Sequence, residues 1–133
     1  MNPTQTLNTY YDAFNRHDWP AMLGLLADDV VHEINEGDAE IGRDAFTKFM
    51  AVMDSAYDET ASDIVVMTSA DGTRAAAEFF IDGRYLLTQP GLPEARGQTY
   101  RLRVGAFFEF NAEGQISRVS NYYNLADWLR QVA

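Results

Sequence analysis

The sequence predicts a single α+β domain, residues 1–133, in which a strongly curved, mixed or antiparallel β-sheet is closed by three helices of the N-terminal half. Two observations support this fold class. The N-terminal half carries apolar residues at helical spacing around one short β-branched segment, and from residue 61 apolar and polar residues alternate as in half-buried strands. Such a sheet with helices across its mouth forms a cup, and an apolar cup with a few polar side chains is typical of a small-molecule site.

Three helices are expected ahead of the sheet. Residues 4–16 carry a stripe of apolar side chains at helical spacing, which predicts the first helix. Asp18 is suited to cap a second helix, whose apolar stripe continues to Leu26 and which stops at the acidic pair that follows. A third helix is predicted from Gly42 to about Asp58, because its aromatic and methionine side chains lie along one side.

Five strands are expected. Residues 30–34 form a short β-branched segment between acidic and turn-forming residues, which predicts the first strand. Residues 64–69 and 73–87 are joined through an Asp-Gly pair that favours a tight hairpin turn. Residues 99–110 and 115–123 complete the sheet, with a Glu-Gly turn between them, and a short helical turn is expected after the last strand.

The strand at residues 99–110 indicates which side of the sheet is buried. Its alternate side chains form one apolar face, which comprises Tyr100, Leu102, Val104, Ala106, Phe108 and Phe110. Between this strand and the preceding one, residues 89–97 contain two Pro and two Gly and exceed the length that a tight hairpin needs. We expect a shaped loop there that overhangs the cup.

Charge and composition exclude several functional classes. Twenty acidic and ten basic residues give a net charge of −10, which would repel a nucleic-acid backbone. The chain has no cysteine, and therefore neither a disulfide nor a thiolate nucleophile. The spacing of its two histidines does not suit a metal site, and no nucleotide-binding motif is present, so we expect no metal and no cofactor. We expect no leader and no membrane span, and hence a cytoplasmic protein.

Three segments occur in a characteristic order: YYDAFNRHD at residues 10–18, LADDV at 26–30 and IGR at 41–43. Together with the order of helices and strands, they resemble the nuclear transport factor 2-like superfamily over nearly the whole chain, and within it the SnoaL-like and ketosteroid-isomerase-related branch. The resemblance implies a cone-shaped fold and a homodimer. The superfamily includes isomerases, hydrolases, dehydratases, cyclases and binding proteins, so the site must decide the reaction.

The resemblance also assigns roles to positions. In the steroid isomerases a tyrosine of the first helix precedes an aspartate by eight residues, as Tyr10 precedes Asp18 in this chain. This match implies that Tyr10 donates its hydroxyl to a developing oxyanion. The general base and the second acid of those enzymes fall at Ile34 and at about Ala106. Neither side chain can move a proton, which argues against steroid isomerisation by that mechanism.

His32 and Tyr10 are the candidate catalytic residues. His32 shares a strand face with Val30 and Ile34, and the family match turns that face into the cone. An ordinary histidine pKa of about 6.5 suits proton transfer, so His32 is a candidate general acid or base. The alternative is a buried neutral histidine with a structural role. Tyr10 is either a donor to the oxyanion or a core aromatic residue.

Six further residues are expected to contact a ligand from the rim or from the inward faces of the strands. They are Ile34, Asn35, Ala106, Phe108, Asn121 and Tyr123. Asn35 has an alternative explanation, because its Asn-x-Gly pattern suits a backbone turn. Glu33 should lie on the opposite face, in solvent. Glu78 either points inward as an acid or base or, as we favour, points outward and pairs with Arg101 or Arg103.

These observations favour a protein that binds a small, apolar or amphipathic molecule bearing a carbonyl or hydroxyl group. Isomerase or lyase chemistry by proton transfer, centred on His32 and Tyr10, is the leading hypothesis. A non-catalytic binding or carrier protein with the same chamber is the first alternative, and a protein-interaction module that uses the outer sheet face is the second. The outward residues are Arg101, Arg103, Phe107, Arg118 and Tyr122. We expect this outer face to form a homodimer interface.

Overall fold

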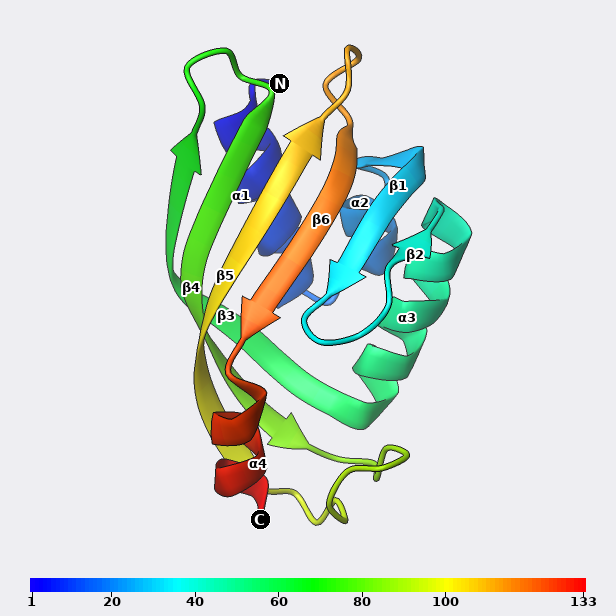
Figure 1. Ribbon diagram of the computed structural model, residues 1–133, viewed down its shortest axis with the longest axis vertical. Helices are drawn as coiled ribbons and strands as arrows, with labels where there is room; N and C mark the ends of the chain where they lie inside the picture. Colours follow the sequence, from blue (N-terminus) through cyan, green and yellow to red (C-terminus); the bar gives the residue numbers. More distant parts are fainter.

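The computed structural model describes residues 1–133 and shows a curled, unclosed six-stranded sheet with helices packed inside the curl (Figure 1). The strands are β1 (Leu26–Ile34), β2 (Glu40–Ile41), β3 (Tyr57–Thr68), β4 (Arg74–Tyr85), β5 (Thr99–Phe110) and β6 (Ile116–Tyr123). The helices are α1 (Pro3–Asn15), α2 (Trp19–Leu23), α3 (Arg43–Ala56) and α4 (Leu125–Val132). The strand order is β2-β1-β6-β5-β4-β3, with β1 parallel to β6 and all other neighbours antiparallel. The predicted α+β fold with a curved, mixed sheet is confirmed.

Several element boundaries differ from those that the sequence predicts. α2 ends at Leu23, and Leu26 is the first residue of β1, where it is fully buried opposite Ile116 of β6. A buried apolar side chain at this spacing fits either a helix or a strand, and pairing with β6 decides between them. α3 ends at Ala56 and β3 begins at Tyr57, ahead of the alternation that starts at residue 61. α4 is a helix of 8 residues rather than a single turn.

The inner face of the sheet is apolar and is covered by helices. On β5 the inward side chains are at most 6% exposed, as the alternation predicts, and they are Tyr100, Leu102, Val104, Ala106 and Phe108. α1 lies across this face, behind β4, β5 and β6 in Figure 1, and buries Leu7, Tyr10 and Tyr11. Burying one such side chain contributes roughly 1.5–3 kcal/mol to folding, so this face anchors the domain. None of the four helices combines the length and the apolar character that crossing a bilayer requires.

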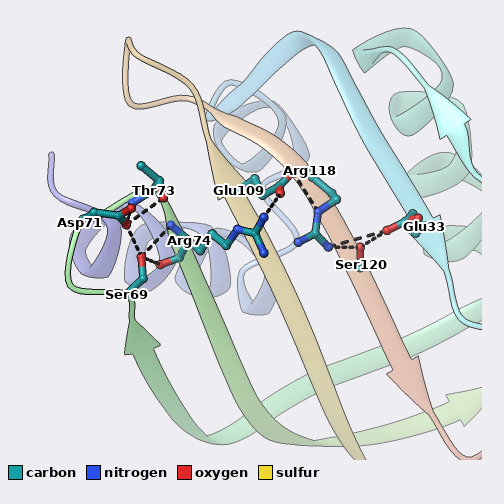
Figure 2. Close-up of polar contacts among 8 residues, drawn as sticks. All are labelled: Glu33, Ser69, Asp71, Thr73, Arg74, Glu109, Arg118 and Ser120. Atoms are coloured by element: carbon teal, nitrogen blue, oxygen red, sulfur yellow. Dashed lines mark hydrogen bonds and ion pairs between the residues drawn. The ribbon is translucent and has the colours of Figure 1, made fainter.

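The outer face of the sheet carries a chain of polar contacts that crosses four strands (Figure 2). Glu109 on β5 pairs with Arg74 on β4 and, at 3.1 Å, with Arg118 on β6. Arg118 also donates a hydrogen bond to the Ser120 hydroxyl, which donates to Oε1 of Glu33 on β1 at 2.5 Å. Glu33 therefore points outward, as predicted, but its half-exposed carboxylate is held by two neighbours rather than free in solvent.

Three more side chains on this face test the predicted orientation of the strands. Glu78 points outward and lies 3.6 Å from Arg103, with more than half of its side chain exposed, so the outward interpretation is confirmed. Phe107 and Tyr122 form an edge-to-face pair with ring centroids 5.9 Å apart, and they are 45% and 50% exposed. An exposed aromatic pair within a charged surface is a feature of association sites, and homodimerisation through this face stays a prediction.

The start of β3 is fixed to α1 by one side chain. Asn15, the last residue of α1, donates from Nδ2 to the Ala61 carbonyl at 2.9 Å and accepts at Oδ1 from the Ala61 N–H at 2.8 Å. These bonds lie just before a β-bulge at residues 62–65, where Asp63 has a φ of 52° and the register with β4 shifts. Because β3 is an edge strand with no neighbour on its other side, Asn15 supplies the partner for two backbone groups of Ala61.

Replacing Asn15 with Ala should lower the free energy of unfolding by about 1–3 kcal/mol, because the half-buried N–H and carbonyl of Ala61 lose their partner. Urea denaturation monitored by circular dichroism measures this loss. Asn8→Ala is the matched control, since Asn8 is exposed on the same helix, and it should cost nothing or stabilise slightly. Equal effects of the two substitutions would contradict the role of Asn15.

Candidate functional site

A cavity of about 460 Å³ lies between the inner face of the sheet and the helices. It is lined by 23 residues, of which 18 are hydrophobic, so it suits a ligand with mostly apolar surface. The five that are not hydrophobic are His32, Glu59, Gln89, Pro90 and Asn121. Glu59 is thus the only carboxyl group in the wall, and His32 is the only imidazole. The chemistry that this cavity can perform depends on these two side chains and on the tyrosine hydroxyls around them.

His32 points from β1 into the cavity and is only 2% exposed. Its ring stacks on Phe46 of α3, with ring centroids 4.0 Å apart, and meets the edge of Phe49 at 4.8 Å. The buried Nδ1 has no hydrogen-bond partner in the protein. Burial lowers the pKa of His32 from 6.5 to about 4, because an apolar setting disfavours the charged imidazolium. At neutral pH His32 is therefore an uncharged ring with free hydrogen-bonding capacity, and it is a weaker base than an ordinary histidine.

Glu59 is the third residue of β3, and its side chain forms part of the cavity wall. The Tyr100 hydroxyl on β5 donates to its Oε2 at 2.6 Å. Burial raises the pKa of Glu59, the hydrogen bond from Tyr100 lowers it, and the neighbouring Asp58 carboxylate raises it further. A carboxyl group whose pKa moves toward neutrality inside an apolar wall is typical of a general acid or base. After burial, Glu59 also raises the pKa of Tyr123, and both side chains line the cavity.

Tyrosine hydroxyls border the cavity at several points. Tyr10 is 4% exposed, and its ring lies edge-on to Tyr11 and to Phe108 at 5.1 and 5.7 Å. Burial raises the pKa of Tyr10, with no hydrogen-bonding partner contributing. Tyr57 lies next to Glu59 in the wall, and its pKa is raised first by burial and then by its tyrosine and glutamate neighbours. All of these hydroxyls are un-ionised donors at neutral pH.

The structure brings five of the eight residues that the sequence nominates into the cavity wall: His32, Tyr10, Ile34, Asn121 and Tyr123. The other three lie outside it. Asn35 adopts a φ of 40° in the turn after β1, and its Oδ1 accepts from the Tyr123 N–H at 3.1 Å, so it ties β1 to β6. Ala106 and Phe108 face inward but are fully buried, and Phe108 packs against Tyr10 and Tyr11 of α1. Strand alternation predicts the face of a residue but not what covers it.

The loop after β4 reaches the cavity, as its length and composition predict. Gln89, Pro90 and Leu92 are part of the wall. The Tyr85 hydroxyl holds this loop, because it accepts from the Gln89 N–H at 3.0 Å and donates to the Pro93 carbonyl at 2.8 Å. The loop therefore forms one edge of the site.

Glu59 is the candidate functional side chain that the sequence analysis does not identify. Residues 57–60 are mostly polar and follow a helix directly, so they do not have the alternation that predicts a strand. The available signal is the phase of β3. Ala61 is buried, and residues 57 and 59 lie at the same parity, so continuing the alternation backward from Ala61 places Glu59 on the inner face.

The chain belongs to the SnoaL-like family, because the model of the SnoaL-like domain matches residues 7–119. Its fold is that of the nuclear transport factor 2-like proteins. One such protein of unknown function, from Burkholderia pseudomallei, superposes with a TM-score of 0.80 at 20% identity, covering 100% of this chain and 98% of that chain. At this level of identity the likeness shows the fold alone.

Two solved structures share much more sequence with the chain. A protein from Pseudomonas putida, provisionally named a polyketide cyclase, is 53% identical with a TM-score of 0.98, covering 100% of this chain and 99% of that chain. A protein from Xanthomonas campestris with the same provisional name is 52% identical with a TM-score of 0.94, covering 98% of this chain and 96% of that chain. No functionally curated protein matches the chain.

The burial of His32 makes the stability of the fold depend on pH. The unfolded chain binds the His32 proton below about 6.5 and the folded protein only below about 4. The His32 ring therefore costs the folded state nothing above pH 6.5. As the pH falls from 6.5 to 4, this ring lowers the free energy of unfolding, and below pH 4 its effect changes no further. The total loss is about 3 kcal/mol.

Urea denaturation of the wild type and of His32→Phe at pH 7 and pH 4.5 measures this effect, since the variant lacks the titrating ring. The wild type should lose more stability than the variant over this interval, and the His32 ring should stay neutral by NMR down to about pH 4. Identical pH dependence in both proteins would show that the ring is not held neutral.

Proposed function

We propose that this protein binds a small, largely apolar carbonyl compound in the cavity and catalyses ring closure or isomerisation by proton transfer, with Glu59 as the general base and acid. The observation that carries the proposal is the single carboxyl group, with a raised pKa, in an otherwise apolar cavity wall. A base in such a wall can remove a proton from carbon next to a carbonyl, because water does not compete for it.

The proton balance of ring closure suits one carboxyl group. Ionised Glu59 removes a proton from the carbon beside a carbonyl, which leaves an enolate and a neutral carboxylic acid. The enolate carbon attacks a second carbonyl of the same molecule, which forms a carbon–carbon bond and an alkoxide. Glu59 then returns the proton to the alkoxide, so the reaction is an isomerisation that consumes nothing. An isomerisation without ring closure uses the first step and returns the proton to a different atom.

His32 and Tyr10 have roles as hydrogen-bond donors in this proposal rather than as the base. The low pKa of His32 makes it a poor proton acceptor at neutral pH, but a neutral imidazole still carries one N–H donor. The Tyr10 hydroxyl offers a second donor from α1. Donors that are fixed before the reaction stabilise negative charge on an enolate oxygen more than water does.

The comparisons support this reaction type. The relatives from Pseudomonas putida and Xanthomonas campestris are provisionally named polyketide cyclases, and they share more than half of their residues with this chain. A polyketide carries alternating carbonyl groups, so its cyclisation needs the enolate chemistry described above. The cavity volume of about 460 Å³ lies within the range of small-molecule sites, which is about 300–1,000 Å³.

Solvent deuterium exchange on a bound ketone tests this proposal. The probes are 2-tetralone and a set of aryl 1,3-diketones, whose acidic carbon-bound hydrogens report enolate formation by NMR. The wild type should accelerate exchange, and Glu59→Gln should lower the rate by about 10²–10⁴-fold while the probe still binds. Glu78→Gln is the matched control, because Glu78 is an exposed carboxylate on the outer face, and it should exchange like the wild type.

Full exchange activity in Glu59→Gln would contradict the assignment of the base. Binding of the probes without any acceleration by the wild type would instead favour a non-catalytic ligand-binding protein.

A further inference from the structure

Glu59 and Tyr100 lie on strands that are not neighbours. The register of the sheet places Glu59 of β3 opposite Gly83 of β4, and Gly83 opposite Tyr100 of β5. Adjacent strands are about 4.8 Å apart, so the two side chains start from backbones roughly 10 Å apart. They nevertheless form a hydrogen bond of 2.6 Å. The Tyr100 side chain must therefore lie across β4 to reach Glu59.

Gly83 is what permits this crossing. A Cβ atom at position 83 would overlap the ring and the hydroxyl of Tyr100. Gly83 has no positive φ and sits inside a long strand, so no turn requires a glycine there. A glycine within a strand costs roughly 0.5–1 kcal/mol relative to alanine, and it commonly marks a place where another group approaches the backbone closely. In this sheet the approaching group is the Tyr100 ring.

The hydrogen bond from Tyr100 makes the two carboxyl oxygens of Glu59 inequivalent. Oε2 accepts from Tyr100, and no protein group donates to Oε1. Glu59 lines the cavity, whereas Tyr100 does not and is only 4% exposed. Tyr100 thus contacts the carboxyl group from behind the wall, and Oε1 is left for the cavity. A fixed carboxylate with one free oxygen presents its basic lone pairs in a defined direction.

We infer that Tyr100 is a positioning residue for Glu59, and that the absence of a side chain at Gly83 is the feature that lets it act. This inference rests on the proton-transfer function proposed above. In this inference, Oε1 is the atom that accepts the proton from the substrate. Gly83, on the strand between Glu59 and Tyr100, is needed because it leaves room for the hydrogen bond that holds the Glu59 carboxylate.

The inference has an electrostatic consequence as well as a geometric one. Donation from Tyr100 favours the ionised carboxylate and so lowers the pKa of Glu59 against the opposing effect of burial. Other titratable groups also lie near Glu59, and they are Asp58 and Tyr57 on its own strand, Tyr123 on β6, Asp54 on α3 and His17 between α1 and α2. None of these groups hydrogen-bonds to the Glu59 carboxyl group, whereas Tyr100 does.

The test is an NMR titration of the Glu59 carboxyl carbon, with ¹³C-labelled glutamate, in the free protein. Tyr100→Phe keeps the ring and removes only the hydroxyl, so the titration midpoint of Glu59 should move to higher pH by about one unit. Gly83→Ala should cause a shift in the same direction, since the added methyl displaces the ring. The double variant should shift no further than Tyr100→Phe alone, because both changes remove one interaction.

Gly105→Ala is the matched control for the glycine substitution. Gly105 also lies inside a strand, but a Cβ atom there would meet only Phe107, at an ordinary 4.0 Å. It should leave the Glu59 titration unchanged. If Gly83→Ala does not fold, Tyr100→Phe carries the test alone, because it adds no atom to the core.

An unchanged Glu59 titration in Tyr100→Phe would overturn the inference whether or not the protein exchanges a ketone proton. If the titration moves as expected but Glu59→Gln retains full exchange activity, the positioning role stands and the proposed function fails. If the positioning role and the proposed function are both correct, the exchange rate of Tyr100→Phe should fall off at a higher pH on the acid side of its pH profile. The displacement should equal the shift of the Glu59 titration midpoint.

Discussion

The apolar inner face of β4, β5 and β6 is the constraint on which the rest of the structure depends. Side chains on this face must be removed from water, and the curl of the sheet turns them toward one another. α1 covers one part of the face closely, with Tyr10 and Tyr11 against Phe79 and Phe108. The side chains from α3 and from the loop after β4 cover the remainder without filling it. The cavity is the volume that this covering leaves.

An apolar cavity imposes opposite demands on its two ionisable side chains. His32 stacks between aromatic rings with no charged partner, so it stays neutral and loses basicity. Glu59 is also disfavoured in its charged form by burial, but a hydroxyl on β5 compensates part of that cost. Burial therefore makes His32, ordinarily the stronger base of the two, a weaker base, and it makes Glu59 a stronger one. The environment, rather than the residue type, assigns the roles.

Much of the architecture could be predicted from the sequence, and the exceptions have specific causes. Alternation on β5 and β6 correctly predicts which side chains face inward, and the position of His32 on the inner face follows from the same rule. The register between β3, β4 and β5 is a long-range property, so neither the approach of Tyr100 to Glu59 nor the need for Gly83 is visible in any local window. Ala106 and Phe108 face inward as predicted, yet both are fully buried outside the cavity wall, and only packing, such as that of α1 on Phe108, decides this.

The relation between the cavity and Glu59 is the central claim of this account. A crystal structure of the protein with bound 2-tetralone tests it most directly. The account predicts the ligand inside the cavity, with a carbon next to its carbonyl within about 3–3.5 Å of Glu59 Oε1 and the Tyr100 hydroxyl still on Oε2. A cavity that is filled by its own side chains, or a ligand that lies only on the outside of the protein, would contradict it.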